Sequence, residues 1–301
     1  MITSLPGIAD VEPFGTGPLR LVVEVPHGAD RRAHYDAVRD RLQSDLPADL
    51  HAFFHINTDV GAWQLGREVA RVVAERTGVT ALVIRCLIPR TFIDCNRVEE
   101  AAAEAGLTAG LAPWIRDEAD RALLIDAYRR YVALVAEALG ALNDGYVLLP
   151  HTYGPRTMNI AAVDDDIVAR LREQVVPATW DNLPLRPEVD LITRWPDGRG
   201  AGPAGMETAL VEGYRAIGVE AVVAKTYQMH AITLAATWDA MCPGRVLCME
   251  VRRDLLVEAW SPFQEMVVSD AAVERLAGPL VEGFLGVLTG SPLQNAAGDP
   301  R

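Results

Sequence analysis

Short apolar runs alternate with longer segments of helical periodicity along most of this chain. The runs are rich in Val, Leu and Ile, and most of them are apolar on both faces. Such runs are typical of interior strands that helices cover on each side of a sheet. The pattern therefore predicts strands at Leu19–Val25, Thr80–Leu87, Gly145–Leu149, Val219–Lys225 and Arg245–Val251.

Amphipathic helices are predicted between these strands. Leu65, Val69 and Val73 fall on one face of the segment Ala62–Arg76, and Gly78 follows that segment as a C-cap. Three further segments show the same periodicity, and they are Asp120–Leu142, Met206–Ile217 and Ala271–Leu288. The alternation of strands and helices predicts an α/β protein with a three-layer α/β/α sandwich.

Two segments break this alternation. Asp181–Pro203 is rich in Pro, Gly and Arg and shows little periodicity, so we expect a long loop that is functional or mobile. The C-terminal segment Ser291–Arg301 is predicted to be a disordered tail. We expect residues 1–290 to form a single catalytic domain, because the candidate site residues are spread from residue 27 to residue 250.

Charge and composition narrow the range of partners. Among 301 residues there are 28 Lys and Arg against 41 Asp and Glu, which gives a formal net charge of −13. This balance argues against nucleic-acid binding, which needs a basic footprint, but a local arginine pocket can still bind a small anion. The sequence contains no apolar window long enough to span a membrane and no signal-peptide pattern at its N-terminus.

The cysteines and the absent motifs narrow the class of enzyme. Cys86, Cys95, Cys242 and Cys248 form no CxxC pair, and we expect buried, reduced thiols in a cytoplasmic protein. The sequence has no GxSxG elbow, no phosphate-binding glycine loop and no HExxH zinc motif. A serine hydrolase of the α/β class and a nucleotide-dependent enzyme are therefore disfavoured.

Two histidines follow a proline at the end of an apolar run. Pro26 and His27 follow the first predicted strand, and Pro150 and His151 follow the third. A lone strand-end histidine often only hydrogen-bonds to backbone, but the repeated motif among six histidines favours a shared metal ion. The carboxyl ends of strands are where α/β sheets place their sites. Two imidazoles plus a carboxylate, with one position left for water, suit Zn2+.

Two aspartates are candidates for the third metal ligand. Asp30 is three residues from His27 in a turn, a spacing that lets both side chains reach one ion. Asp59 precedes the predicted helix that begins at Ala62, where it or Thr58 can instead serve as the N-cap. The spacing by itself does not choose between Asp30 and Asp59.

A polar run follows the second predicted strand and contains Arg90, Asp94, Asn96 and Arg97. In an extended segment, Asp94 and Asn96 share one face. Arginines near a zinc site bind a substrate carboxylate or polarise a carbonyl. The alternative is a surface ion-pair cluster, which the apolar residues within and beside the run disfavour.

Glu250 interrupts the last of the predicted strands, which is otherwise strongly apolar. A buried carboxylate needs either a partner or a chemical role. Beside zinc-activated water, a Glu is the expected general base and acid of amide hydrolysis. A structural ion pair with Arg252 or Arg253 is the alternative, and the residues alone leave both open.

These motifs, taken in order, resemble those of the N-formylglutamate amidohydrolase family, which is distantly similar to the zinc carboxypeptidases and to aspartoacylase. Pro26-His27-Gly28 is similar to the first strand-end motif of the family. Asp59 is similar to the acidic residue that precedes the next helix in the family, and His151 is similar to the family's second strand-end histidine. The most specific matches are Arg90-x-x-x-Asp94-Cys95-Asn96-Arg97 and Glu250–Leu255. The chain departs from the family pattern at Gly28-Ala29 and at Thr152-Tyr153. The resemblance covers about residues 20 to 257.

The resemblance implies a mixed, mostly parallel sheet of the zinc carboxypeptidase (phosphorylase/hydrolase-like) type. It also implies a zinc ion held by His27, His151 and one aspartate. The closer family pattern favours Asp59, and the zinc carboxypeptidase pattern favours Asp30.

The resemblance also implies roles for the other candidates. Glu250 is the general base and acid, and Arg90 or Arg97 stabilises the oxyanion. The other arginine, together with Asn96, binds the substrate carboxylate, and Asp94 orients Arg97. Further arginines that could add specificity are Arg252, Arg194 and Arg199.

The expected function is zinc-dependent hydrolysis of an amide bond. The expected substrate is a small N-acyl amino acid, a class that includes the N-formyl amino acids, or a related carboxylate. Within enzymes, the alternative is a zinc peptidase acting on a peptide end or a tailoring hydrolase of a specialised pathway. Outside enzymes, the alternative is a metal-free binding module, against which the buried Glu250 argues. The expected partner is a small carboxylate, with no nucleic acid and no membrane, and the sequence does not set the oligomeric state.

Overall fold

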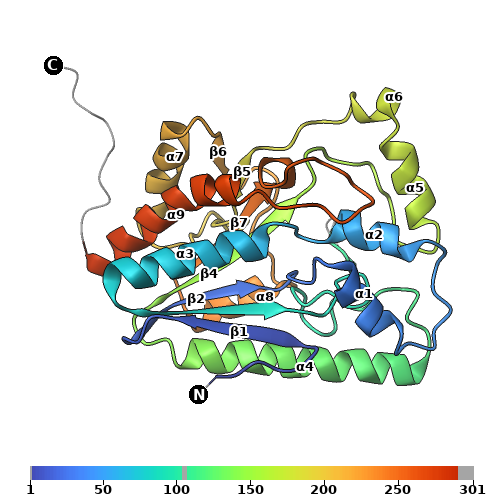
Figure 1. Ribbon diagram of the computed structural model, residues 1–301, viewed down its shortest axis with the longest axis horizontal. Coiled ribbons are helices and arrows are strands. Elements are labelled where there is room, and N and C mark those ends of the chain that lie inside the picture. The colour runs from blue at the N-terminus through green and yellow to red at the C-terminus, as the bar shows by residue number, and fades with distance from the viewer. Residues whose placement is uncertain (1, 104–106, 291–301) are drawn as a thin grey trace.

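The computed structural model describes residues 2–103 and 107–290, and within them seven strands form one sheet in the order β1-β3-β2-β4-β7-β5-β6 (Figure 1). The strands are β1 (Ala9–Phe14), β2 (Leu19–Val25), β3 (Thr80–Cys86), β4 (Tyr146–Tyr153), β5 (Val189–Leu191), β6 (Ala221–Val223) and β7 (Val246–Arg252). The predicted tail, residues 291–301, lies outside the described residues.

The sheet is mixed and mostly parallel, as the resemblance implied. β3, β2, β4 and β7 are neighbours that pair in parallel, and β5 pairs in parallel with β6. Two antiparallel pairings, β1 with β3 and β5 with β7, make the sheet mixed. The carboxyl ends of β2, β4 and β7 therefore lie at one edge of the sheet, where a site can draw on all three strands.

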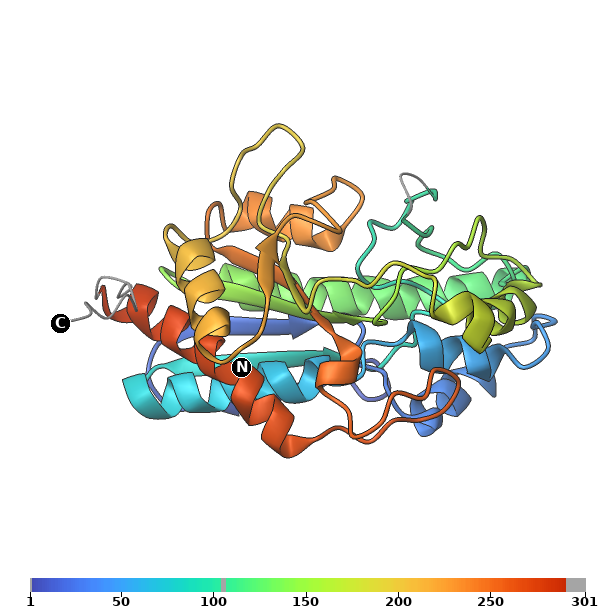
Figure 2. The ribbon, with the colours of Figure 1, turned by 90° about the horizontal axis from the view of Figure 1, so that it is seen from above.

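Helices cover both faces of the sheet. They are α1 (Arg32–Arg39), α2 (Leu50–Asn57), α3 (Ala62–Thr77), α4 (Glu118–Gly140), α5 (Ile167–Gln174), α6 (Pro177–Trp180), α7 (Met206–Ala216), α8 (Leu234–Met241) and α9 (Asp270–Thr289). Figure 2 shows α3 and α9 on one side of the sheet and α4 and α8 on the other. Leu65, Leu210 and Phe284 are fully buried in the core beneath α3, α7 and α9, and Tyr131 and Trp238 fill the opposite core. The predicted three-layer α/β/α architecture is confirmed.

Two glycines set the limits of α3. Gly61 is its N-cap at φ +89°, and Gly78 is its C-cap at φ +75°, as predicted. A Cβ on Gly61 would also lie 2.9 Å from side-chain atoms of Leu256. Because L side chains rarely adopt this left-handed conformation, the turn that leads into α3 depends on glycine at position 61.

The sequence pattern located the long elements better than the short ones. The predicted strand at Val219–Lys225 is only three residues long in the structure, and β1 was not predicted. The expectation of an unstructured loop over Asp181–Pro203 is wrong at β5, which lies inside that segment. A strand of three residues is too short to produce a recognisable periodicity. The helices that were missed, α2, α5, α6 and α8, have at most eight residues each.

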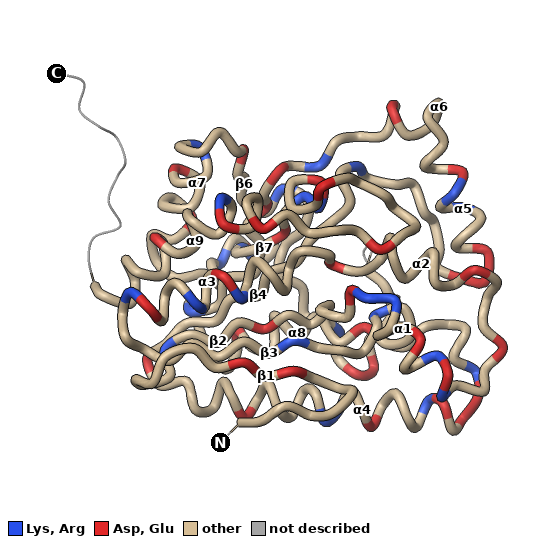
Figure 3. The backbone as a smooth tube through the Cα atoms, viewed as in Figure 1, with Lys and Arg blue, Asp and Glu red and all other residues tan. Residues whose placement is uncertain are grey.

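Several general expectations can be compared with the structure. All four cysteines are buried and free, as predicted. Within the described part of the chain, no helix combines the length and the apolar character needed to cross a bilayer. Figure 3 shows acidic and basic residues interspersed along most elements, so the excess of acidic residues is not confined to one segment.

Glu24 is a buried carboxyl group near the carboxyl end of β2. Burial raises the pKa of Glu24 to about 8, although the Tyr131 hydroxyl, which donates a hydrogen bond to Oε1 at 3.0 Å, opposes the rise. In the unfolded chain the ordinary value of 4.5 applies. Between these two values, unfolding releases a proton, so the free energy of unfolding falls as pH rises.

We therefore expect Glu24→Gln to flatten the pH dependence of stability. Between about pH 5 and about pH 8, the ionisable carboxyl costs the wild type up to ~1.4 kcal/mol per pH unit, and the neutral amide does not. Chemical denaturation at three pH values in this range measures the difference. Glu137→Gln, on the exposed face of α4, is the matched control. Parallel profiles for the wild type and Glu24→Gln would contradict this expectation.

Candidate metal centre

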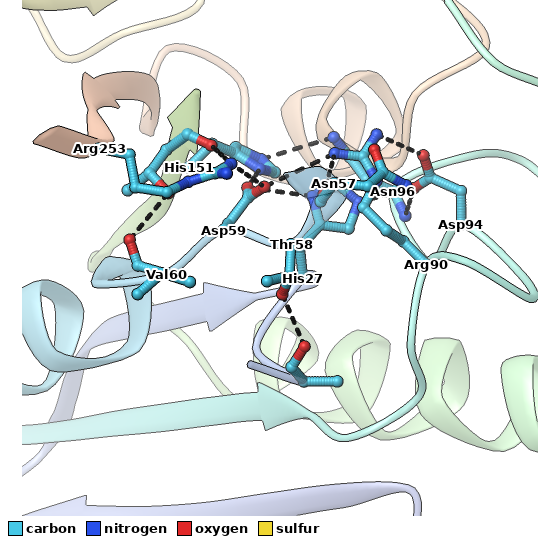
Figure 4. A network of polar contacts seen from close by, with 12 residues as sticks. His27, Asn57, Thr58, Asp59, Val60, Arg90, Asp94, Asn96, His151 and Arg253 are labelled. Carbon is cyan, nitrogen blue, oxygen red and sulfur yellow. Dashed lines mark hydrogen bonds and ion pairs between the residues drawn. The ribbon is translucent and has the colours of Figure 1, made fainter. Parts of the chain in front are cut away.

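Two histidines and an aspartate meet at the carboxyl edge of the sheet (Figure 4). His27 follows β2, His151 lies in β4, and Asp59 lies in the turn between α2 and α3. Asp59 Oδ2 is 3.1 Å from His27 Nδ1 and 3.0 Å from His151 Nδ1. Each of the three residues is only 3% exposed. Three polar side chains from distant parts of the sequence thus share one buried point.

Hydrogen bonds behind the two histidines orient their rings. His27 Nε2 lies 2.7 Å from Asp94 Oδ1, and donation of Nε2–H to this carboxylate would leave Nδ1 free to bind a metal ion on the side of Asp59. The Asn96 amide nitrogen lies 3.5 Å from His151 Nε2. Turning this amide by 180° presents its carbonyl oxygen, which has no partner among the described residues, to the same ring nitrogen. Both rings can therefore direct Nδ1 towards a common ligand.

The charges around the two aspartates keep both of them ionised. Burial acts to raise the pKa of Asp59, but the facing rings of His27 and His151 outweigh it and hold that pKa below its ordinary range. Burial likewise opposes ionisation of Asp94, whose pKa is lowered by Arg97 and Arg90. The buried point thus has a carboxylate between two imidazoles, with a second carboxylate behind one of them.

This donor set fits a divalent metal ion. In the described part of the chain, His27, Asp59 and His151 are the group whose ligand atoms all lie within 4.8 Å of one another. Bond lengths of about 2.0–2.1 Å at a tetrahedral ion place neighbouring ligand atoms about 3.3 Å apart, close to the separations found here. Three protein ligands leave the fourth position of a tetrahedral ion open for water or substrate.

Asp30, the other candidate ligand, has a different set of partners. Its Oδ1 lies 2.5 Å from Arg85 Nη2 and 3.8 Å from both Arg31 Nε and His34 Nδ1. Asp30 is therefore engaged by a cation on β3 and does not belong to the ligand group. The structure places Asp59, and not Asp30, between the two histidines.

Neither Thr58 nor Asp59 caps α3, so the alternative role considered for them is wrong. The N-cap is Gly61, which has no side chain to offer. Thr58 Oγ1 instead donates a hydrogen bond to the Ala29 carbonyl oxygen at 2.6 Å. This bond ties the turn that carries Asp59 to the loop that carries His27, and so it helps to hold the two residues together.

The polar run after β3 is buried, so it is not a surface ion-pair cluster. Arg90 Nη2 lies 3.0 Å and Arg97 Nη2 lies 3.7 Å from Asp94 Oδ2, and the Asn96 backbone N–H donates to Asp94 Oδ1. Arg90 also reaches towards the group formed by His27, Asp59 and His151, with Nη1 at 3.6 Å from Asp59 Oδ1 (Figure 4). Asp94 thus orients Arg90 and Arg97 together with the His27 ring.

Glu250 lies next to His151, because the two residues are register partners in the parallel pair of β4 and β7. Its Oε2 is buried and has no hydrogen-bond partner within the described residues. Burial and the neighbouring Asp59 carboxylate raise the pKa of Glu250 to about 7. A carboxylate with such a pKa can both accept and return a proton near neutral pH. The alternative of a structural ion pair with Arg252 or Arg253 is wrong, since neither is among its ion-pair partners.

A cavity of about 330 Å³, the central cavity, opens at this edge of the sheet. Its wall includes His27, Asn96, His151 and Glu250, and it is lined by four arginines, Arg90, Arg97, Arg186 and Arg253. Three of the predicted arginines do not line it. Arg252 pairs with Asp254 at 2.9 Å, and Arg194 pairs with Glu207. Arg199 is also outside the wall and packs over Trp195.

Arg253, rather than Arg252, is the arginine of its segment that reaches the site. β7 ends at Arg252, and the chain turns into a 3-10 helix at Arg253. Arg253 donates to the carbonyl oxygens of Thr152 at 2.9 Å and Ile56 at 3.0 Å. It thereby joins the end of β4 to the end of α2, on either side of Asp59 (Figure 4).

Arg186 was not identified from the sequence, although it lies in the irregular segment Asp181–Pro203 that was expected to be functional. Its guanidinium lies over the Tyr153 ring at 5.0 Å, and its Nε lies 3.3 Å from Thr157 Oγ1. Arg90, Arg97 and Arg253 each have a carboxylate within 4 Å. Among the described residues, Arg186 has no such partner, so it is the cavity arginine best able to bind an anion from outside.

Comparison with known proteins identifies the fold. The chain matches no protein-family model, and it matches none of the curated proteins. Among solved structures, it is similar to N-formylglutamate amidohydrolase from Ralstonia eutropha, with a TM-score of 0.59, 18% identity, and coverage of 94% of this chain and 99% of that one. A gene product from Agrobacterium tumefaciens gives a TM-score of 0.53 at 17% identity, with 94% of each chain covered. The chain therefore has the α/β fold that is seen in N-formylglutamate amidohydrolase.

Proposed function

We propose that this chain is a zinc-dependent hydrolase that cleaves the amide bond of a small N-acyl amino acid or a related carboxylate. The observation that carries the proposal is the buried group His27, Asp59 and His151, with Glu250 beside it in a cavity lined by arginines. The similarity in fold to an enzyme named N-formylglutamate amidohydrolase supports the same class of reaction.

Each residue of the site has a role in this reaction. His27, Asp59 and His151 would hold a zinc ion, which would supply the Lewis acidity that makes water a nucleophile near neutral pH. Glu250 accepts a proton from the attacking water and returns it to the leaving nitrogen. Arg90, held by Asp94 at the cavity wall, offers its guanidinium to the oxygen on which negative charge develops.

Arg186 is the residue that we assign to the substrate carboxylate. A guanidinium without a protein carboxylate partner can form paired, charge-assisted hydrogen bonds to a ligand carboxylate. Arg97 and Asn96, which the sequence suggested for this role, are occupied in holding Asp94 and the His151 ring. We therefore assign Arg97 and Asn96 to positioning the metal ligands.

Replacement of Arg186 tests this assignment. We expect Arg186→Met to raise KM for an N-acyl amino acid by about 10- to 100-fold, which corresponds to the loss of a charge-assisted pair, with a smaller effect on kcat. The carboxamide analogue of the same substrate should be bound equally weakly by both proteins. Arg252→Met is the matched control, because Arg252 pairs with Asp254 outside the cavity wall. A larger effect from Arg252→Met would assign the carboxylate to that arginine instead.

The proposed reaction is tested with the zinc-loaded full chain. The assay follows the release of free amino acid from the N-formyl, N-acetyl and N-hexanoyl derivatives of glutamate and alanine, with dipeptides as a further group. We expect hydrolysis of at least one N-acyl amino acid, its loss on chelation, and its return when zinc is added back. Cleavage of dipeptides alone would identify a peptidase, and no cleavage by zinc-loaded protein would contradict the proposal.

A further inference from the structure

A second cavity adjoins the central cavity on the side of Arg90. Its volume is about 460 Å³, larger than that of the central cavity. Phe53, Asn57, Arg90, Leu107 and Ile160 line both cavities. Because these side chains stand at the boundary of both cavities, we take the second cavity as a side lobe of the candidate site. We call it the side lobe.

The walls of the side lobe are mostly apolar away from this junction. They include Leu111, Ala112, Pro113 and Trp114 from one loop and Ala162 from another. Trp114 is fully buried, and its indole N–H already donates to the Thr91 carbonyl oxygen at 3.1 Å. Among the described residues that line the lobe, the charged one is Arg90, at the junction. Such a wall favours an apolar group over a charged one.

Aromatic packing gives the side lobe a fixed corner. The rings of Phe53 and Trp114 meet edge to face, with their centroids 5.7 Å apart and an interplanar angle of 88°. Phe53 is only 7% exposed and belongs to α2, the helix that leads into the turn of Asp59. Trp114 supports Phe53 from behind, and a substrate group that contacts Phe53 is therefore linked by α2 to the segment that carries a proposed metal ligand.

Charge placement suggests which part of the substrate enters the side lobe. Arg186, to which we assign the carboxylate, lines the central cavity but not the side lobe. Arg90, to which we assign the developing oxyanion, lines both. A substrate with its carboxylate at Arg186 and its carbonyl oxygen at Arg90 would direct the acyl chain into the side lobe.

We propose that the side lobe binds an apolar acyl group of several carbon atoms. This inference rests on the proposed function and makes it more specific. The favoured substrate class is a medium-chain or aromatic N-acyl amino acid, rather than an N-formyl compound. A formyl group would leave the apolar lobe filled with water, whereas a longer acyl chain would release that water and gain the free energy of apolar burial.

Binding measured without turnover tests the inference. Zinc-loaded Glu250→Gln is titrated by calorimetry with N-hexanoylglutamate and N-formylglutamate, which share the carboxylates and differ only in acyl length. We expect the hexanoyl ligand to bind at least about 10-fold more tightly. Filling the lobe from either side, with Ala112→Leu or Ala162→Leu in the same background, should reduce this ratio. Ala122→Leu, on the exposed face of α4, is the matched control and should preserve it.

The outcomes separate the inference from the proposed function. Equal affinity for the two ligands, or a preference that both lobe variants leave unchanged, would overturn the assignment of the lobe. Ala162 is exposed at the surface, so its variant remains informative if Ala112→Leu fails to fold. A preference for the hexanoyl ligand without hydrolysis of any N-acyl amino acid by the zinc-loaded wild type would support the lobe while contradicting the hydrolase.

Discussion

Zinc-loaded Glu250→Gln is expected to retain its metal and its fold and to lose turnover by about 10²- to 10⁴-fold, the usual contribution of a general acid–base group. Glutamine preserves the shape of the side chain, but its amide cannot accept a proton from water at neutral pH. Glu250 is a credible base because it is the register partner of His151 and has a buried carboxylate oxygen with no partner in the described chain.

The measurement combines kinetics with metal analysis. Initial rates of N-acyl amino acid hydrolysis give kcat, and elemental analysis gives the zinc content of each variant. Glu258→Gln is the matched control, since Glu258 is exposed a few residues beyond the end of β7. An active Glu250→Gln variant would show that another group moves the proton. A variant that has lost its zinc would show that Glu250 belongs to the metal site.

Asp59→Asn is expected to weaken zinc binding by about 100-fold or more, whereas Asp30→Asn should keep about one zinc per chain. Removing a direct ligand should weaken zinc binding by more than the roughly 10- to 100-fold that is typical of removing a residue that only hydrogen-bonds to a ligand. Asp59 Oδ2 lies within 3.1 Å of both imidazole Nδ1 atoms, whereas the Asp30 carboxylate is paired with Arg85.

Competition with a zinc chelator gives the affinities, and far-UV circular dichroism shows whether each variant is folded. His27→Ala should behave like Asp59→Asn, because it removes another ligand of the same group. Zinc loss from folded Asp30→Asn together with retention in Asp59→Asn would reverse the ligand assignment.

Much of the fold could be predicted because its central elements are long and strongly patterned. Continuous runs of Val, Leu and Ile predicted β2, β3, β4 and β7, and apolar periodicity predicted the helices that cover them. The two histidines could be found for a related reason. Parallel strands bring their carboxyl ends to one edge of a sheet, so His27 and His151 were expected to meet although 124 residues separate them.

The rest of the site depends on side-chain directions that spacing does not determine. Spacing left both Asp30 and Asp59 open, and only the family resemblance favoured Asp59. In the structure Asp30 faces Arg85 on β3 and Asp59 faces the histidines. Arg252 and Arg253 are neighbours, yet the change from strand to 3-10 helix sends only Arg253 into the cavity wall.

The sequence by itself therefore determined the layered α/β architecture, the pair of strand-end histidines, the buried polar run after β3 and the isolated Glu250. These features are local, because each follows from the residue types within one element and its immediate flanks. The tertiary structure decided the choice of Asp59, the assignment of Arg186 to the cavity and the existence of the side lobe. Irregular loops with no periodic pattern supply Arg186 and most of the lobe wall, and only the packing of those loops against the sheet edge brings them together.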